Sequence, residues 1–367
     1  MPFKKREKPY KKRFLAWQVE ITTRCPAFCA MCIKAGYREW DRKDMDISDF
    51  KTILPYLGDV EYLVLEGWGE SLLHPELLDF ISLAKPSGAE VGFVTSGAGL
   101  DQHYITELIR AGLDFIGFSL AGAKPKTHNA IRPGSDFDTL IDSIKFFKEI
   151  SLEKKLNYPK IRIVYLMLKS NIEELPLLIE LANDIGVKEV TLINIIQITT
   201  PWQDQQKVFS YASSAALPKT SENFSNLSGI LTEANKMAKR SKIKLTMPPL
   251  IAGEVAVCAE DPLNNIYINV EGDVSPCVFL NPPVPSPFPR IFGGEKTTLE
   301  KVSFGNILRE PFEKIWNKPE YVDFRDTFKK RKEKADELYN SLFTMKLPGE
   351  LPPPPIPCRT CHKLLGV

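Results

Sequence analysis

The sequence predicts an α/β protein built on a parallel sheet. Apolar, strand-like runs alternate with amphipathic segments over residues 17–240, and six such strand–helix units in succession are typical of a parallel sheet covered by helices. With 367 residues, 43% of them hydrophobic, the chain can bury one large core and a smaller one. We therefore expect two domains.

The expected strands are short runs rich in β-branched and aromatic residues: 17–22, 62–66, 91–95, 115–120, 161–167 and 190–195. The expected helices are amphipathic: 47–57, 75–84, 104–111, 137–150, 172–185 and 222–240. Asp136 and Asn171 are typical N-caps, and Gly112 and Gly186 follow the last turns of two of these helices. Residues 201–228 lack a clear period and are expected to form a loop over the barrel, in which Trp202 and Gln203 are candidate substrate contacts.

Charge and hydropathy limit the partners. Lys and Arg total 48 against 46 Asp and Glu, so no overall field favours nucleic acid. No run of 18 apolar residues is present, which predicts a cytoplasmic protein without a membrane partner. Two basic runs, in a tail over residues 1–14 and over residues 329–334, are expected to be solvated.

The most informative stretch follows the first expected strand. Cys25, Cys29 and Cys32 are spaced C-x3-C-x2-C, and three thiolates on one short loop suit an iron–sulfur cluster. Three ligands leave one iron of a four-iron cube open, which suggests a bound small molecule. Structural zinc with a fourth ligand elsewhere, or plain reduced thiols, are the alternatives.

Together with the approach over residues 20–24, this loop resembles the signature of the radical S-adenosylmethionine (SAM) enzymes. The resemblance implies a partial (β/α)6 TIM-like barrel. It also implies that the open iron of the cluster on this loop binds SAM. It also implies an electron donor of the flavodoxin or ferredoxin type. Reductive cleavage of SAM would then give a 5'-deoxyadenosyl radical, which removes a hydrogen atom from the substrate.

Loops at the carboxyl ends of parallel strands form the site in such folds. The resemblance assigns SAM contacts to six residues there: Gly69, Glu70, Ser96, Ser119, Arg132 and Asn194. A surface ion pair is the alternative for Arg132, a polar strand end for Asn194, and packing is favoured over a site role for His128. Trp68 and Ala121 depart from the family pattern, at a glycine and an acidic position respectively.

A second group of cysteines lies near the carboxyl terminus: Cys258, Cys277, Cys358 and Cys361. Residues 266–277 read as a hairpin around a Glu-Gly-Asp turn, and the spacing from Cys258 to Cys277 resembles the start of a SPASM or twitch extension. Ile307, Phe312, Ile315 and Trp316 are expected to be core residues of a capping helix. Four thiolates close every iron of a second four-iron cluster, which would accept an electron, and zinc is the alternative.

The expected domains are therefore the tail at 1–14, a barrel at 15–245 and a small twitch- or SPASM-like cluster-binding domain at 246–367. The resemblance implies SAM and two 4Fe-4S clusters as cofactors, and an oxidative modification of a peptide or protein. The alternatives are a small-molecule dehydrogenase acting on a sugar, alcohol or cofactor precursor, and a non-catalytic iron–sulfur or zinc protein on a degenerate barrel.

Overall fold

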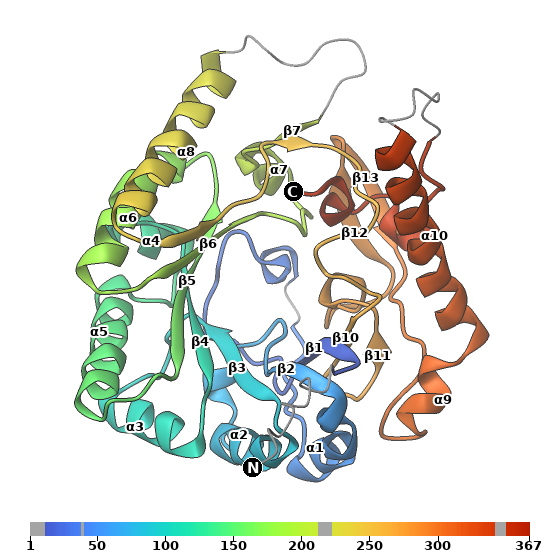
Figure 1. Ribbon diagram of the computed structural model, residues 1–367, viewed down its shortest axis with the longest axis horizontal. Helices are drawn as coiled ribbons and strands as arrows, with labels where there is room; N and C mark the ends of the chain where they lie inside the picture. Colours follow the sequence, from blue (N-terminus) through green and yellow to red (C-terminus); the bar gives the residue numbers. More distant parts are fainter. Residues whose placement is uncertain (1–11, 38–39, 212–221, 342–349) are drawn as a thin grey trace, which may run out of the picture.

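The computed structural model describes residues 12–37, 40–211, 222–341 and 350–367. Its centre is a nine-stranded sheet in the order β11-β10-β1-β2-β3-β4-β5-β6-β8, curved into an open barrel with helices on its outer face (Figure 1). All neighbouring strands are parallel except the pair β10 and β11. The predicted fold class, a partial TIM-like barrel followed by a small second domain, is confirmed.

The six predicted strands are present, and most begin one to three residues earlier than expected: β1 Phe14–Val19, β2 Val60–Val64, β3 Glu90–Thr95, β4 Phe115–Leu120, β5 Lys160–Met167 and β6 Glu189–Asn194. β3 and β4 are buried over most of their length, because helices cover one face and the barrel interior the other. β8 (Lys244–Thr246) extends the sheet beyond β6, and the sequence showed no pattern for so short a strand.

The barrel helices follow their strands: α1 Ile47–Ile53, α2 Leu77–Ala84, α3 Gln102–Ala111, α5 Phe137–Glu153, α6 Leu175–Asp184 and α8 Glu222–Arg240. Asp136 caps α5 by accepting a hydrogen bond from the Thr139 amide, and Gly112 ends α3 with a φ of +93°. Asn171 makes no side-chain cap and instead bonds backbone groups around it. A further helix, α4 (Pro125–Ile131), follows β4.

The predicted hairpin is formed by β10 (Asn265–Ile268) and β11 (Val274–Ser275), with Gly272 of its turn at a φ of +84°. β10 also pairs in parallel with β1, with Trp17 opposite Ile266, and no local pattern predicts this pairing. The second part of the chain therefore extends the barrel sheet. A separate hairpin, β12 (Phe288–Phe292) with β13 (Glu295–Leu299), lies farther along the chain.

α9 (Phe312–Trp316) packs on the first strand of the barrel. The ring of Phe312 is 4.6 Å from that of Trp17, and the ring of Trp316 is 5.0 Å from that of Phe14. Such aromatic pairs contribute about 0.5–1.5 kcal/mol each beyond their buried area. The predicted core role is confirmed for Phe312, Ile315 and Trp316, which are buried in this helix, whereas Ile307 is buried in a turn that precedes it.

Two expectations about basic residues need correction. Lys12 donates hydrogen bonds to the carbonyls of Val60 and Gly88, so the end of the expected tail is bound to the barrel, while residues 1–11 lie outside the described residues. Arg331, in α10 (Pro319–Ser341), is fully buried rather than solvated. No helix in the described parts of the chain has both the length and the apolar character that a bilayer span requires.

Candidate functional site

The first cysteine loop leaves the carboxyl end of β1 and is held by the segment that follows α4. The Phe28 amide donates to the Pro133 carbonyl at 2.8 Å, and the Ala30 amide donates to the Ile131 carbonyl at 3.1 Å. Gly134, with a φ of +93°, lets this segment approach closely, because a Cβ there would lie 3.0 Å from Cα of Ala27. The loop is therefore ordered by backbone pairing with a distant part of the barrel.

The three thiols of this loop, Cys25, Cys29 and Cys32, are free and influence one another electrostatically, which places them together. Burial raises the pKa of Cys25, and it raises the pKa of Cys32 to about 12. Thiols in such surroundings become ligands when a metal supplies positive charge. Three free thiols on one loop, Cys29 buried and Cys25 and Cys32 partly buried, are a donor set of the type that holds an iron–sulfur cluster.

Two cations lie against the same loop. Nζ of Lys34 is 2.7 Å from the Cys25 carbonyl and 3.3 Å from the Ala27 carbonyl, and the residue is only 9% exposed. Nη1 of Arg132 is 3.8 Å from Sγ of Cys29. The structure therefore places Arg132 at the cysteine loop and shows no ion pair for it in the described chain, which corrects the alternative of a surface pair.

Gln203 fixes the loop from the other side of the barrel. Gln203 lies in α7 (Pro201–Gln206). This capped helix falls within the segment that was expected to be a loop. The side chain is fully buried, and Nε2 donates to the carbonyls of Ala30 and Cys32, each at 3.2 Å. Gln203 is thus a support of the cysteine loop, and the expectation that it contacts substrate is not supported, whereas Trp202 is 40% exposed.

Glu70 is at the centre of a buried network at the ends of β2 and β3. Oε1 accepts from the Thr95 hydroxyl at 2.6 Å, and Oε2 accepts from the amide and the hydroxyl of Ser96 at 2.8 and 2.6 Å. The neighbouring Gly69 is required by close approach, because a Cβ there would lie 2.1 Å from the Thr22 carbonyl oxygen. Glu70 thus connects the loop after β2 to the end of β3, and Gly69 packs against Thr22, which precedes the cysteine loop. In this structure these two expected SAM contacts support the site.

The network continues through His128. Nδ1 accepts from the Ala121 amide at 3.3 Å, so Nε2 donates to the Ser135 hydroxyl at 3.0 Å, and that hydroxyl donates to the Ser96 carbonyl at 2.8 Å. Burial lowers the pKa of His128 to about 4, which keeps the ring neutral. The packing role expected for His128 agrees with these contacts.

Asn194 lies at the end of β6 and is 4% exposed, yet neither atom of its side-chain amide has a hydrogen-bond partner within the described residues. An unpaired buried amide costs about 1–3 kcal/mol, so its partners belong to a ligand or to ordered water. Ser119, half-buried at the end of β4, belongs to the same carboxyl edge of the sheet. Asn194 is the expected SAM contact that best fits a polar cofactor.

The second cysteine group is brought together from three distant parts of the chain. Cys277 follows β11, Cys258 precedes β10, and Cys358 and Cys361 come from the C-terminal segment. All four are free, and the pKa of Cys277 responds to the charges of the other three. Burial raises the pKa of Cys258 to about 12 and those of Cys277 and Cys358 well above the usual range.

Two buried arginines hold this group in place. Arg290 donates to the carbonyls of Phe279, Pro357 and Thr360 and to Oε1 of Gln197 in the barrel, at 3.2–3.5 Å. Arg331 donates to the carbonyls of Val255, Ala256 and Pro352 and pairs with Glu254 at 2.7 Å. Trp68, the departure from the family pattern, donates from its ring to the Val278 carbonyl at 3.2 Å, so it links the barrel to the residue after Cys277.

No three Cys, His, Asp or Glu side chains within the described ranges are arranged to hold a single metal ion. Sequence reasoning missed Lys34, Gln203, Arg290 and Arg331 as supports, since nothing in the sequence reveals which polar residues face distant carbonyls.

The profile of the radical SAM superfamily matches residues 19–193, and that of the SPASM iron–sulfur cluster-binding domain matches residues 253–339. A tungsten-containing aldehyde ferredoxin oxidoreductase cofactor-modifying protein of Pyrococcus furiosus is 26% identical over 84% of this chain and 82% of its own. A PqqA peptide cyclase of Xanthomonas axonopodis pv. citri is 21% identical over 84% of this chain and 76% of its own.

Solved structures share the fold. Streptococcus suis SuiB bound to its precursor peptide SuiA superposes with a TM-score of 0.58 at 15% identity, over 97% of this chain and 71% of that one. The anSMEcpe protein with bound AdoMet superposes with a TM-score of 0.59 at 14% identity, over 84% of this chain and 79% of that one. At these identities the likeness establishes the architecture.

Proposed function

The chain belongs to the radical SAM superfamily and carries a C-terminal SPASM domain, and on that basis we propose that it is an enzyme that oxidatively modifies a peptide or protein. The observation that carries the proposal is the presence of two separate groups of free, buried or partly buried cysteines, of which the first adjoins the carboxyl ends of the barrel strands. The PqqA cyclase and SuiB likenesses support a peptide as substrate.

We propose that Cys25, Cys29 and Cys32 hold a 4Fe-4S cluster with an open iron for SAM, and that Cys258, Cys277, Cys358 and Cys361 hold a second, fully ligated cluster. When bound, the first cluster and SAM supply a radical able to take a hydrogen atom from carbon. The residues of the chain position these groups: Gln203 and Lys34 order the first loop, and the Asn194 amide orients a polar part of SAM.

The proposed division places the barrel at residues 15–245 and the auxiliary domain at residues 246–367, which the two profile matches support. Arg290 spans both, because it bonds Gln197 of the barrel and the carbonyls next to Cys358 and Cys361. A buried cation beside the second group of thiolates favours the more reduced cluster, which suits an electron acceptor. The primary electron donor is proposed to be a flavodoxin or ferredoxin.

The test is anaerobic reconstitution of the full chain followed by iron and zinc analysis and incubation with SAM and dithionite. About eight irons per chain, falling to about four in a Cys25→Ala/Cys29→Ala/Cys32→Ala variant, is expected for two cubes. The wild type should form 5'-deoxyadenosine and the variant should not. About four irons with one zinc would refute the second cluster.

A small molecule is the second candidate substrate. The likeness to a Pyrococcus furiosus protein named for modifying a cofactor favours it. Affinity capture with the reconstituted enzyme in cell extract separates the two classes, because a peptide substrate is retained as a polypeptide with a mass change. Recovery of an oxidised low-molecular-weight product with no modified polypeptide would replace the first candidate by the second.

A further inference from the structure

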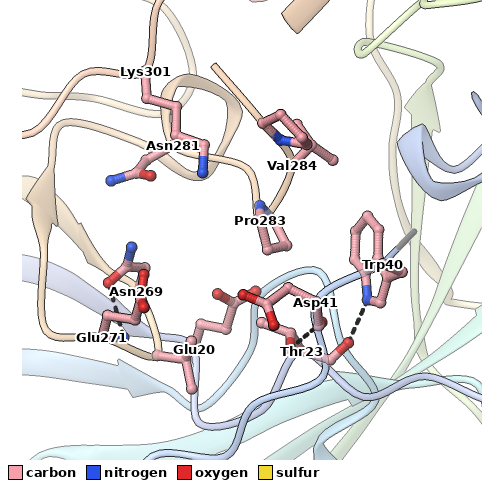
Figure 2. Close-up of a pocket in the computed structure, with 12 residues that line it drawn as sticks. Glu20, Thr23, Trp40, Asp41, Asn269, Glu271, Asn281, Pro283, Val284 and Lys301 are labelled. Atoms are coloured by element: carbon pink, nitrogen blue, oxygen red, sulfur yellow. Dashed lines mark hydrogen bonds between the residues drawn. The ribbon is translucent and has the colours of Figure 1, made fainter. Parts of the chain in front are cut away.

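A cavity of about 470 Å³ lies at the carboxyl ends of β1 and β10, where the barrel meets the second cysteine domain (Figure 2). Cavities of this size are typical of small-ligand sites. Its walls come from both parts of the chain: Glu20, Thr23 and Trp40 belong to the first part, and Asn269, Asn281 and Lys301 belong to the second. None of the SAM contacts proposed above lines it.

Most of the charge around this cavity is already balanced. Lys43 pairs with Asp41 at 2.8 Å and with Glu271 at 2.5 Å, so these two acids share one cation. Glu20 and Lys301 have no ion pair in the part of the chain that the structure describes. Figure 2 shows the carboxyl group of Glu20 and the ammonium group of Lys301 on different sides of the cavity.

Glu20 is completely buried and only half satisfied. Oε1 accepts a hydrogen bond from the Trp68 amide at 2.7 Å, and Oε2 makes no hydrogen bond of regular geometry within the described residues, although the Tyr267 hydroxyl and the Val270 amide lie close enough to stabilise the carboxylate. Gly67 provides the space for this side chain, because a Cβ there would lie 2.4 Å from it. Burial raises the pKa of Glu20 to about 7, although the nearby Tyr267 hydroxyl opposes the shift, so a cationic ligand would both complete its bonding and favour its ionised form.

The opposite side of the cavity offers groups for an anion and for apolar carbon. Burial lowers the pKa of Lys301, a shift that four nearby carboxylates, those of Glu271, Asp273, Asp41 and Glu20, oppose and that an anionic ligand would oppose further. Asn281 is 3% exposed and lines this side of the cavity with Lys301. Trp40, held by a hydrogen bond from its ring to the Thr23 carbonyl at 2.6 Å, faces the cavity with Pro283 and Val284, as Figure 2 shows.

We propose that this cavity binds a ligand that carries one cationic and one anionic group, with the cation on Glu20 and the anion on Lys301 and Asn281. An α-amino acid zwitterion and a peptide segment with adjacent basic and acidic side chains share this chemistry. The inference rests on the proposed function for its meaning, since it describes how the substrate is recognised. Ligand binding can be measured without enzymatic turnover. An experiment can therefore refute the cavity proposal without refuting the proposed function, and the reverse also holds.

The experiment measures binding to the reconstituted full chain by titration calorimetry and by the fluorescence of Trp40. The probes are norleucine, norleucine amide, N-acetylnorleucine, N-acetylnorleucine amide and the blocked dipeptide N-acetyl-Lys-Glu-amide. Norleucine and the dipeptide carry both charges, norleucine amide and N-acetylnorleucine carry one, and N-acetylnorleucine amide carries none. At least one of the two doubly charged probes should bind about tenfold or more tightly than the other three, because each charged contact contributes about tenfold in affinity. Tight norleucine binding identifies an amino-acid source, and tight dipeptide binding identifies a peptide source.

Variants locate the binding. E20Q should weaken both norleucine and norleucine amide, whereas K301M should weaken norleucine and N-acetylnorleucine, each by about tenfold. K145M, at an exposed site on α5, is the control and should bind as the wild type does. W40F should abolish the fluorescence change but leave calorimetric binding measurable.

Equal binding of all probes, or no binding of any, would overturn the proposal, as would wild-type affinity in K301M. Because Lys301 is partly exposed, K301M is expected to fold even where E20Q does not. 5'-Deoxyadenosine formation is measured on the same preparations. If the wild type forms no 5'-deoxyadenosine, the proposed enzyme activity is refuted, and the cavity proposal is still judged by the binding data.

Discussion

The side-chain amide of Gln203 donates a 3.2 Å hydrogen bond to the backbone carbonyl of Cys32, across 171 positions of sequence. This contact holds the backbone of the first cysteine loop against α7. Several expected outcomes depend on such long-range supports.

Replacing Gln203 by Ala should lower the free energy of unfolding by about 1–3 kcal/mol, because the Ala30 carbonyl loses its buried donor and the Cys32 carbonyl keeps only the Ala35 amide. Iron at the first site should fall while iron at the second site is retained. Denaturant unfolding and iron analysis measure the two effects. Gln205→Ala, at an exposed position of the same helix, is the control, and equal losses in both variants would refute the support role.

Gly69→Ala should prevent the barrel site from forming. The new Cβ would meet the Thr22 carbonyl at 2.1 Å, and neither backbone can move freely, so we expect destabilisation of about 3 kcal/mol or more. Gly58→Ala adds the same methyl group where nothing lies within 4 Å. Thermal unfolding compares the two; similar melting temperatures would show that the close approach is not real.

Asn194→Leu should separate stability from cofactor binding. The wild-type amide is buried without partners, so an apolar side chain should leave the stability of the SAM-free protein unchanged or raise it. SAM affinity, measured by equilibrium dialysis, should fall about tenfold. Asn171→Leu is the contrast, since its amide bonds Ala121, Leu166 and Leu168, and it should destabilise the protein. Unchanged SAM affinity in Asn194→Leu would remove Asn194 from the cofactor site.

His128 should make the protein sensitive to acid. Its pKa is about 4 in the folded chain against about 6.5 when unfolded, so below pH 6.5 the unfolded state binds more protons. The stability contributed by neutral His128 is complete above pH 6.5 and decreases as the pH falls toward 4, by about 1–2 kcal/mol between pH 7 and pH 5.

The difference in unfolding free energy between the wild type and His128→Asn should therefore shrink over this range. Urea titrations at several pH values measure it. His103→Asn, an exposed site on α3, serves as the control. A difference that stays constant from pH 7 to pH 5 would contradict a neutral, buried imidazole.

Arg331→Met should loosen the C-terminal segment. Its guanidinium bonds three carbonyls and Glu254, so its removal leaves several buried acceptors unpaired and should cost about 3 kcal/mol or more. Iron at the second site should be lost preferentially. Lys332→Met, the exposed neighbour in α10, should retain both stability and iron, and parallel losses would show that charge alone matters.

The barrel was predictable because its strands and helices have clear local patterns, as in the runs that became β4 and α5. α7 was missed because its six residues are too short to show a helical period, although Thr200 and Gln203 form a capping box. The pairing of β10 with β1 could not be predicted either, because each strand would have the same local sequence pattern if it lay at the edge of a sheet.

The cysteine groups were identified from their spacing, but the contacts that hold them were not. Arg331 looked solvated because it stands among charged residues, and only the docking of residues 254–256 and 352 makes that helix face buried. Similarly, Glu20 belonged to a recognisable motif, yet its unpaired oxygen appears only when Gly67, Trp68 and the hairpin turn surround it.

The pairing of β1 with β10 has a consequence for synthesis on the ribosome. The Ala16 amide in β1 donates a hydrogen bond to Oδ1 of Asn265, 249 positions later. β1 is therefore synthesised long before β10, the strand that pairs with its outer edge. Until then that edge carries unpaired backbone groups open to pairing with other chains. A nascent or truncated barrel ending before residue 265 is therefore expected to aggregate or to need a chaperone, and the auxiliary domain supplies the strand that completes its edge.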